Sequence, residues 1–168
     1  MRISERQRRL ERLAWAGGFF DGEGSTFARG VSSRPGYRRL NVAVPQRGDA
    51  VVPEVLVRFR TAMNGMGRIS HPFNDLYQWR VGDDTQARAV IALLRPWIGP
   101  AKRRQAARAV LIVDEQYSSG RIKGRPGRRL PPIRMPRVVR DTLPVEPRQR
   151  LERAWAAGFL DGEGCSAS

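Results

Sequence analysis

The sequence predicts a mixed α/β fold of the α+β type, in which helices pack against an antiparallel sheet made of two hairpins. Apolar residues change between helical and strand spacing in the order helix, strand, strand, helix, strand, strand, helix, helix. The phrase AWAGGFFDGEGS at residues 14–25 returns as AWAAGFLDGEGC at residues 154–165. Because 168 residues hold one ordinary core, we expect one complete unit with this order of elements and the first helix of a second.

The unit begins with an amphipathic helix and a hairpin. Helical spacing covers residues 4–22, and Ser4 is a candidate N-cap. Alternating apolar and polar residues then predict strands within 25–33 and 36–46, separated by the turn-like SRPG. Several arginines lie on these strands, so their exposed faces carry positive charge.

The second part of the unit repeats this order. Helical spacing returns over residues 51–63, where Pro53 is tolerated in the first turn. The segments RISHPF at 68–73 and LYQWRVG at 76–82 then predict a second hairpin. The sheet is therefore expected to contain four strands.

Two helices complete the unit. The first covers residues 85–94, with Asp83 or Asp84 as its cap, and a longer one covers 101–118. Together these elements define a predicted domain over residues 1–119.

The remaining sequence divides into a linker and a second start. Residues 120–147 are rich in Pro, Gly and Arg with little apolar periodicity, which is typical of a partly extended linker. Residues 148–168 restart the first helix, at a period of 140 residues measured from Trp15 to Trp155. They are expected to form the first helix of a second repeat.

Composition narrows the class of partner. The chain has 31 Lys and Arg against 16 Asp and Glu, a net charge of +15, which attracts nucleic acid first and anionic membranes second. No apolar run could span a bilayer, and no hydrophobic signal segment follows the basic start. One Cys and one His exclude a disulfide framework or a Cys/His zinc site within one chain. We expect an intracellular protein, cytoplasmic or organellar and not secreted, in which oxygen atoms hold any catalytic metal.

Each copy of the repeated phrase combines small residues with a terminal Asp-Gly-Glu-Gly. Small residues let two helix faces approach closely. The residues expected at this interface are Ala14, Gly17, Gly18, Ala154, Ala157 and Gly158. The same packing gathers the carboxylates of Asp21, Glu23, Asp161 and Glu163. Gathered carboxylates repel unless a hard cation such as Mg²⁺ lies between them, so we predict a divalent-cation site; the alternative is two helix C-caps with solvated acids.

The two phrases resemble the LAGLIDADG motif of the homing endonucleases, and residues 4–119 are similar to one half of that family in their order of elements. The resemblance implies that the motif helices form a central interface. It also implies that the last acidic positions, Glu23 and Glu163, bind catalytic metal, with Asp21 and Asp161 nearer the helix ends. The implied activity is metal-dependent hydrolysis of phosphodiester bonds at a specific site in double-stranded DNA, by an enzyme of the intron-encoded kind.

Two further positions match the family's pattern. Gln46, at the end of the second strand, corresponds to a polar residue that helps hold the attacking water. Lys102, in the loop that opens the last helix, corresponds to a lysine that stabilises negative charge at the phosphate. The alternatives are a strand-end residue for Gln46 and a solvated base for Lys102.

The predicted sheet offers side chains suited to the major groove. Arg and Gln can make bidentate contacts with base edges, and arginines also neutralise phosphates. The candidate DNA-binding residues are Arg29, Arg34, Arg38, Arg39, Arg68, Gln78, Arg80 and Arg103. Because side chains alternate along a strand, only about half of the strand residues can face the DNA.

Double-motif members of the family carry a full second half after the second motif, and this chain does not. We expect a truncated double-motif protein that needs a second half-domain; the alternative is a homodimer paired through its first motif helices. Three functions remain open. The chain is a DNA endonuclease, a relative that binds DNA or intron RNA without cutting it, as maturases and regulators do, or an inactive fragment of a longer endonuclease.

Overall fold

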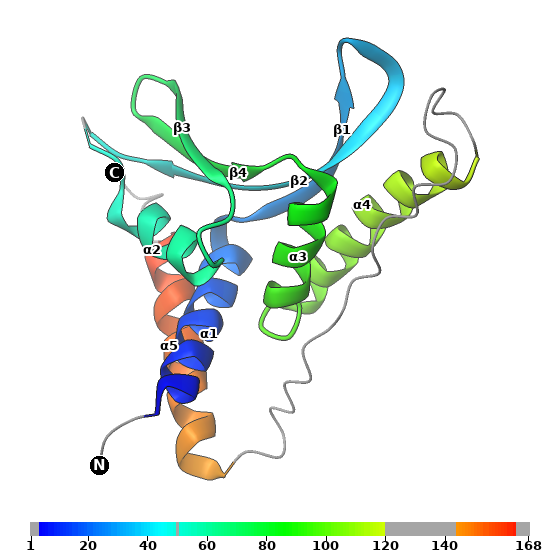
Figure 1. Cartoon of the computed structure of the whole chain (residues 1–168). Coiled ribbons are helices and arrows are strands. Elements are labelled where there is room, and N and C mark those ends of the chain that lie inside the picture. The colour runs from blue at the N-terminus through cyan, green and yellow to red at the C-terminus, as the bar shows by residue number, and fades with distance from the viewer. Residues whose placement is uncertain (1–3, 50, 120–143, 164–168) are drawn as a thin grey trace.

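The computed structural model describes residues 4–49, 51–119 and 144–163. Its elements follow the predicted order and end with one additional helix (Figure 1). They are α1 (Glu5–Glu23), β1 (Ser25–Val31), β2 (Arg34–Arg47), α2 (Glu54–Ala62), β3 (Arg68–Phe73), β4 (Leu76–Val81), α3 (Asp84–Leu94), α4 (Pro100–Ser118) and α5 (Val145–Glu163). Ser4 caps α1 through Gln7 N–H, and Asp83 caps α3 through Gln86 N–H. No described helix is long and apolar enough to cross a membrane.

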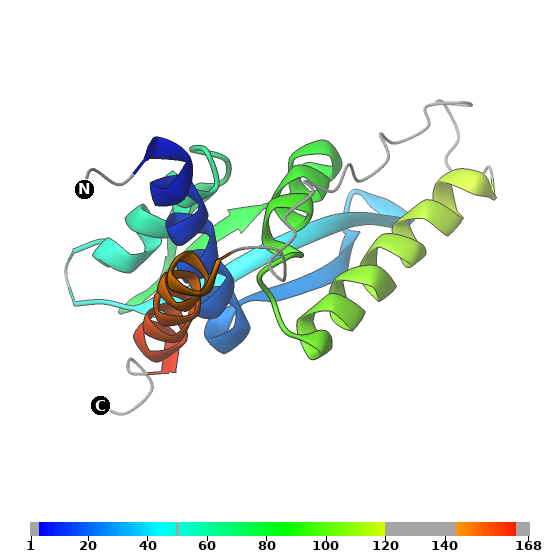
Figure 2. The same ribbon diagram turned by 90° about the horizontal axis from the view of Figure 1, so that it is seen from below.

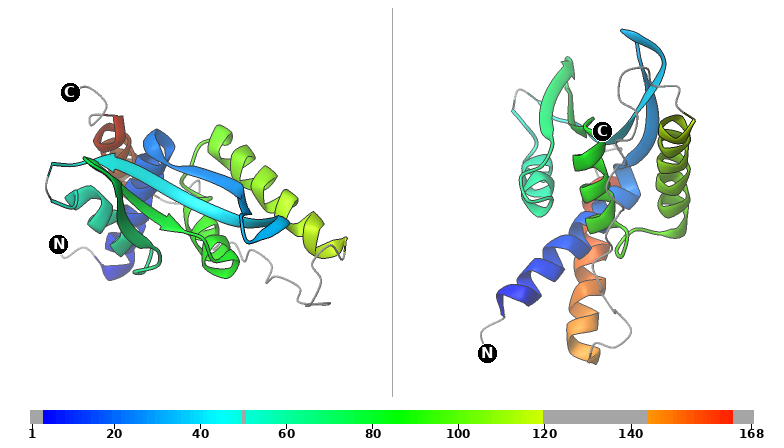
Figure 3. Two further views of the ribbon diagram at one scale, coloured as in Figure 1. Left: turned by 90° about the horizontal axis from the view of Figure 1, so that it is seen from above. Right: turned by 45° about the vertical axis from the view of Figure 1, so that its right-hand side comes forward.

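The four strands form one antiparallel sheet in the order β1-β2-β4-β3. All helices lie on one side of it, and the opposite face is left uncovered when the molecule is seen from above (Figure 3). Residues on β4 alternate between the two faces, because Tyr77, Trp79 and Val81 are buried while Gln78 and Arg80 are partly exposed. We call the uncovered side the open face.

Three predicted boundaries are wrong by a few residues. The first hairpin turns at Ser32 and Ser33, so β2 begins at Arg34 and takes in most of the SRPG segment. Pro53 precedes α2 as its N-cap, with φ −57°. α5 begins at Val145, three residues before the expected 148. Most of the predicted linker lies outside the described residues.

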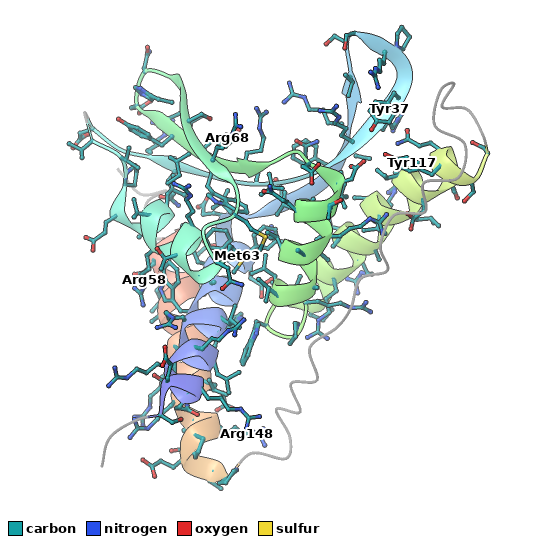
Figure 4. All side chains as sticks on the ribbon, in the orientation of Figure 1. Tyr37, Arg58, Met63, Arg68, Tyr117 and Arg148 are labelled. Atoms are coloured by element: carbon teal, nitrogen blue, oxygen red, sulfur yellow. The ribbon has the colours of Figure 1, made fainter. Side chains whose placement is uncertain are left out.

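The core lies between the sheet and the helices. Trp15, Trp79 and Trp97 are fully buried, and Phe59 of α2 meets Trp79 edge to face with ring centroids 4.9 Å apart. Burial of these rings supplies much of the stabilisation of a chain this size. Met63 also lies in this layer, between α2 and α3 (Figure 4).

Candidate functional site

The two motif helices, α1 and α5, lie side by side and cross at a glycine in each (Figure 1 and Figure 2). A Cβ built on Gly18 would lie 1.9 Å from the Trp155 carbonyl oxygen. Reciprocally, a Cβ on Gly158 would lie 1.9 Å from the Trp15 carbonyl oxygen. Backbone therefore touches backbone, and no larger residue fits at either position.

One stripe with four-residue spacing forms the crossing. It contains Ala14, Gly18 and Gly22 on α1 and Ala154, Gly158 and Gly162 on α5, all of which are small. A Cβ on Gly22 would lie 3.5 Å from Gly162 Cα, which places both glycines in contact. The predicted interface did not include this last pair, although its four-residue spacing from Gly18 and Gly158 was a usable signal.

The structure corrects two of the predicted interface residues. Gly17 faces its own domain, since a Cβ there would lie 2.3 Å from Trp97 Cβ. Its equivalent, Ala157, is exposed to solvent. Successive residues point about 100° apart around a helix, so neighbours such as Gly17 and Gly18 cannot share one partner.

Glu23 and Glu163 are brought together at the C-terminal ends of the crossed helices. The Cγ of Glu23 lies 3.4 Å from the position of a Cβ on Gly162, the residue before Glu163. Gly24 ends α1 by donating its N–H to Phe20 O, and β1 starts at the next residue. The end of α1 is therefore fixed to the sheet, directly beside the end of α5.

Asp21 is held by protein groups. Both of its carboxylate oxygens accept the N–H of Gly99, the N-cap of α4, at 2.9 and 2.7 Å, and Trp155 also donates to it. Burial raises the pKa of the Asp21 carboxyl, while the Gly99 N–H and the charge of Lys102 act against the rise. A metal-binding role for Asp21 stays a prediction, and these contacts favour a structural role.

Asp161 has the matching position on α5, where the tryptophan of the other motif helix also donates to it, but its second partner is different. Its Oδ2 accepts the Trp15 indole N–H at 2.8 Å and lies 3.6 Å from Nη1 of Arg58. The Arg58 guanidinium carbon also lies 3.9 Å from the centre of the Trp15 ring, and Figure 4 shows this side chain beside the two motif helices. No sequence signal pointed to Arg58. Its contacts favour a structural role for Asp161 as well.

Lys102 is placed next to the candidate site. Its Nζ donates to the carbonyl oxygen of Gly24, one residue beyond Glu23. Arg103, the next residue, uses its Nε to donate to Ile98 O at 2.8 Å. Both lie at the start of α4, away from the open face, so Arg103 does not join the strand arginines.

Gln46 lies on the helix-facing side of β2, opposite Tyr77. Its side chain is 3% exposed, and its Oε1 is buried without a hydrogen-bond partner among the described residues. A buried acceptor without a donor is costly and rare. Gln46 therefore presents an unused acceptor at the strand end where the sequence predicted a functional residue.

The register of the sheet sorts the predicted DNA-binding residues. Arg29 pairs with Arg39, and Arg68 pairs with Arg80, on the same side as Gln78. These five side chains belong to the open face. Arg38 pairs with Gly30 and belongs to the helix-facing side, although it is exposed, so its contact with DNA stays a prediction.

A broad hollow of about 1700 Å³ lies over one end of the open face. Arginines from several elements line it, namely Arg29, Arg34, Arg39, Arg60, Arg68 and Arg80. Figure 4 shows Arg68 between β3 and β4 above the sheet. A concave surface lined by arginines suits a polyanion better than a small apolar ligand.

The predicted site suits a cation that takes only some of its coordinating oxygens from the protein and the others from water and substrate. No group of three or more His, Cys, Asp or Glu side chains placed to hold a metal occurs among the described residues. The predicted donor set is therefore the Glu23 and Glu163 carboxylates with nearby backbone oxygens. Mg²⁺ is commonly held by one or two carboxylates together with waters and substrate phosphates, so these residues match that cation.

No protein-family model and no curated protein matches the sequence. Solved structures of homing endonucleases do match. I-CvuI in complex with its target in the presence of Ca is 19% identical, with TM-score 0.53, over 88% of this chain and 96% of I-CvuI. I-CvuI with the I-CreI target and Mg is 22% identical, with TM-score 0.51, over 63% of this chain and 66% of that one.

A third match is the LAGLIDADG meganuclease I-AabMI bound to uncleaved DNA, which is 18% identical with TM-score 0.53. The match covers 66% of this chain but only 39% of I-AabMI. These similarities confirm the predicted fold class: the chain has the fold of the LAGLIDADG homing endonucleases.

Proposed function

We propose that this chain is a sequence-specific double-strand DNA endonuclease of homing type that hydrolyses phosphodiester bonds with a divalent cation. One observation carries the proposal: two glutamates lie at the adjoining ends of glycine-packed helices, on a fold whose open sheet face is lined with arginine. A protein that only binds a polyanion gains little from acids placed beside the phosphates. The DNA-bound state of its structural neighbours agrees with the proposal.

Glu23 and Glu163 would hold the cation, with Mg²⁺ as the candidate. When bound, such a cation polarises a phosphoryl oxygen and lowers the pKa of a coordinated water. Gln46 would accept a hydrogen bond from the attacking water through its unused Oε1. The Lys102 ammonium would add positive charge beside the scissile phosphate, from its position at Gly24.

The open face would position the duplex. Arg29, Arg39 and Arg80 project from neighbouring strands, which suits base edges in the major groove, while the net charge of +15 supplies general attraction. We therefore expect affinity that falls steeply with salt. An intracellular location, cytoplasmic or organellar, follows from a DNA substrate and remains part of the proposal.

A binding-only function is the second candidate, and one feature of α5 favours it. The outward side of α5 carries Leu160, which is 67% exposed, and no second sheet packs there among the described residues. One sheet reads only half of a two-fold site. Cutting would then require a second half-domain, or a homodimer formed through α1, whereas binding requires neither.

A cleavage assay tests the proposal. Purified chain is incubated with a randomised duplex library and Mg²⁺, beside Glu23→Gln, Glu163→Gln and the control Glu152→Gln, whose exposed carboxylate pairs only with Arg148. We expect wild type and control to cut a defined site, and each site variant to lose at least about a hundredfold in rate while still binding DNA.

The mass of the particle in solution is measured in the same samples. A cutting dimer supports pairing through α1, and a cutting monomer supports a site built by Glu23 and Glu163 of one chain. Binding without cutting by the wild type would replace the endonuclease proposal with the binding-only function. Unchanged cutting by Glu23→Gln would overturn the assigned site.

A further inference from the structure

Strand β2 continues past the end of its neighbour β4. β4 ends at Val81, which pairs with Val42, whereas β2 begins at Arg34. Residues 34–41 of β2 therefore have β1 on one edge and no strand on the other among the described residues. Backbone N–H and C=O groups on such an edge need other partners.

Two side chains replace the missing strand. The Leu40 N–H donates to Asp84 Oδ1 at 2.8 Å. The Arg38 N–H donates to Gln116 Oε1 at 2.7 Å, and Gln116 Nε2 donates back to Arg38 O. The Gln116 amide thus satisfies a donor and an acceptor of one residue, as an antiparallel strand would.

Both side chains are themselves fixed. Asp84 and Gln116 are each 8% exposed, and the Tyr117 hydroxyl donates to Asp84 Oδ2 at 2.9 Å. Tyr37 of β2 lies near Tyr117 (Figure 4), and their hydroxyl oxygens are 3.2 Å apart. Burial and these two hydrogen bonds raise the pKa of Tyr117, so its hydroxyl keeps its proton and remains a donor. The cluster ties β2 to the start of α3 and the end of α4.

The segment held in this way carries two arginines of the open face. We call residues 28–31 of β1 and 34–41 of β2 the arm. Arg29 and Arg39 are cross-strand partners on it, and the Arg39 guanidinium lies 5.8 Å from the Tyr37 ring centre. The arm lies at the opposite end of the molecule from the crossing of α1 and α5 (Figure 1). Its contacts would therefore fall in the outer part of a DNA half-site.

We propose that Gln116 and Asp84 are positioning residues for sequence recognition, which hold the arm so that Arg29 and Arg39 reach base edges at outer positions of the target. The proposal rests on the DNA binding proposed above. A bidentate arginine contact discriminates between bases only when the strand beneath it is fixed. We call Gln116 and Asp84 together the clamp. The clamp binds the backbone of β2, so it affects recognition without touching DNA.

Selection of bound duplexes from a randomised library, followed by sequencing, tests this role without depending on cutting. Wild type, Gln116→Ala, Gln116→Glu and Arg39→Ala are compared. We expect Gln116→Ala to lose about tenfold in base preference at the outer positions that Arg39→Ala also affects, and to keep the inner preferences. Gln116→Glu retains an acceptor for Arg38 N–H but no donor for Arg38 O, so its loss should be smaller.

Gln105→Ala is the matched control. Gln105 lies on the same helix and also holds a strand, by accepting Thr26 N–H at 3.2 Å outside the arm. We expect its base preferences to equal those of wild type. Hydrogen exchange in the free protein adds a second readout, in which Gln116→Ala should speed exchange at the Arg38 amide and leave Val44 protected.

Two outcomes would overturn the positioning role separately from the function. If wild type selects a site and Gln116→Ala selects it with the same preferences, the clamp does not guide recognition. A uniform loss at all positions by Gln116→Ala would indicate a general structural role instead. If wild type selects no sequence, the proposed DNA recognition fails, and the positioning role fails with it.

Discussion

The two motif helices have nearly the same sequence and very different surroundings. In α1 every residue from Leu13 to Phe20 is buried, because one side packs on α5 and the other on the sheet and its helices. In α5 only Leu151, Gly158 and Gly162 are buried. Phe20 is 1% exposed, and its counterpart Leu160 is 67% exposed.

This difference separates two functions of the repeated phrase. The stripe of small residues serves the partner helix and is preserved in both copies. The large apolar positions serve a sheet, and α5 has no such layer among the described residues. The aspartates differ in the same way: Asp21 is held by Gly99 of its own domain, whereas Asp161 is held by Arg58 of α2.

The largest effect should come from filling the crossing. In Gly158→Leu the new side chain would meet Trp15 O at 1.9 Å, which only separation of the helices can relieve. We expect the free energy of unfolding to fall by about 3 kcal/mol or more, measured by urea denaturation. Ala157→Leu, one residue earlier and exposed, should change it by less than about 0.5 kcal/mol.

Equal losses in these two variants would show that α5 does not pack through Gly158. Gly18→Leu sharpens the comparison, because its clash with Trp155 O is the reciprocal one. We expect it to be as destabilising as Gly158→Leu. If Gly158→Leu is less destabilising than Gly18→Leu, α5 dissociates from α1 in Gly158→Leu while the first domain stays folded.

An intermediate effect is expected from Arg58, which contacts Trp15 of α1 and Asp161 of α5. Arg58→Ala removes the cation–π contact with Trp15 and the ion pair with Asp161, both of which are partly exposed. We expect a loss of about 1 kcal/mol, because each such contact is worth less than that at the surface. Arg60→Ala, on the same helix and with its Nε on Gly65 O, is the control. If Arg58→Ala loses no more stability than the control, the Arg58 contacts do not stabilise the packing of α1 against α5.

The sequence was sufficient for most of the fold because its signals are local. Ser4 and Asp83 cap their helices as predicted, and period-two alternation located β3 and β4. The repeat predicted the helix pair, but not which glycines face the partner, since that depends on rotation about the helix axis. Gly17 was therefore assigned to the wrong side, and the contact of Gly22 with Gly162 was not predicted.

The site was harder to predict, because its details depend on residues distant in the chain. Lys102 donates to the carbonyl oxygen of Gly24, the residue after Glu23, and its role at the phosphate stays a prediction. The Gln116 clamp and the Arg58 contact depend on where β4 stops and on how α2 faces α5. Neither leaves a pattern in the local sequence, so only the assembled fold shows them.

The smallest expected effect is on the stability of variants at the two aspartates, and at Asp21 it depends on pH. Burial raises the pKa of Asp21 above its ordinary value of 3.8, so over the pH range just above 3.8 the folded chain keeps a proton that the unfolded chain has lost. The free energy of unfolding contributed by Asp21 therefore falls as pH rises through that range. Asp21→Asn keeps an oxygen acceptor for Gly99 N–H and removes the charge, so its stability relative to wild type should rise with pH there.

Asp161→Asn provides the opposite sign. It keeps an acceptor for the Trp15 indole but loses the charge that faces Arg58 at 3.6 Å, so at neutral pH it should be a few tenths of a kcal/mol less stable than wild type. Urea denaturation in metal-free buffer measures Asp21→Asn from about pH 3 to pH 7 and Asp161→Asn at neutral pH. If the two variants shift in the same direction, the different partners of Asp21 and Asp161 do not control the energies of these carboxylates. Opposite shifts would show that one phrase, placed in two settings, gives its aspartate a destabilising charge in the buried setting and a stabilising one beside Arg58.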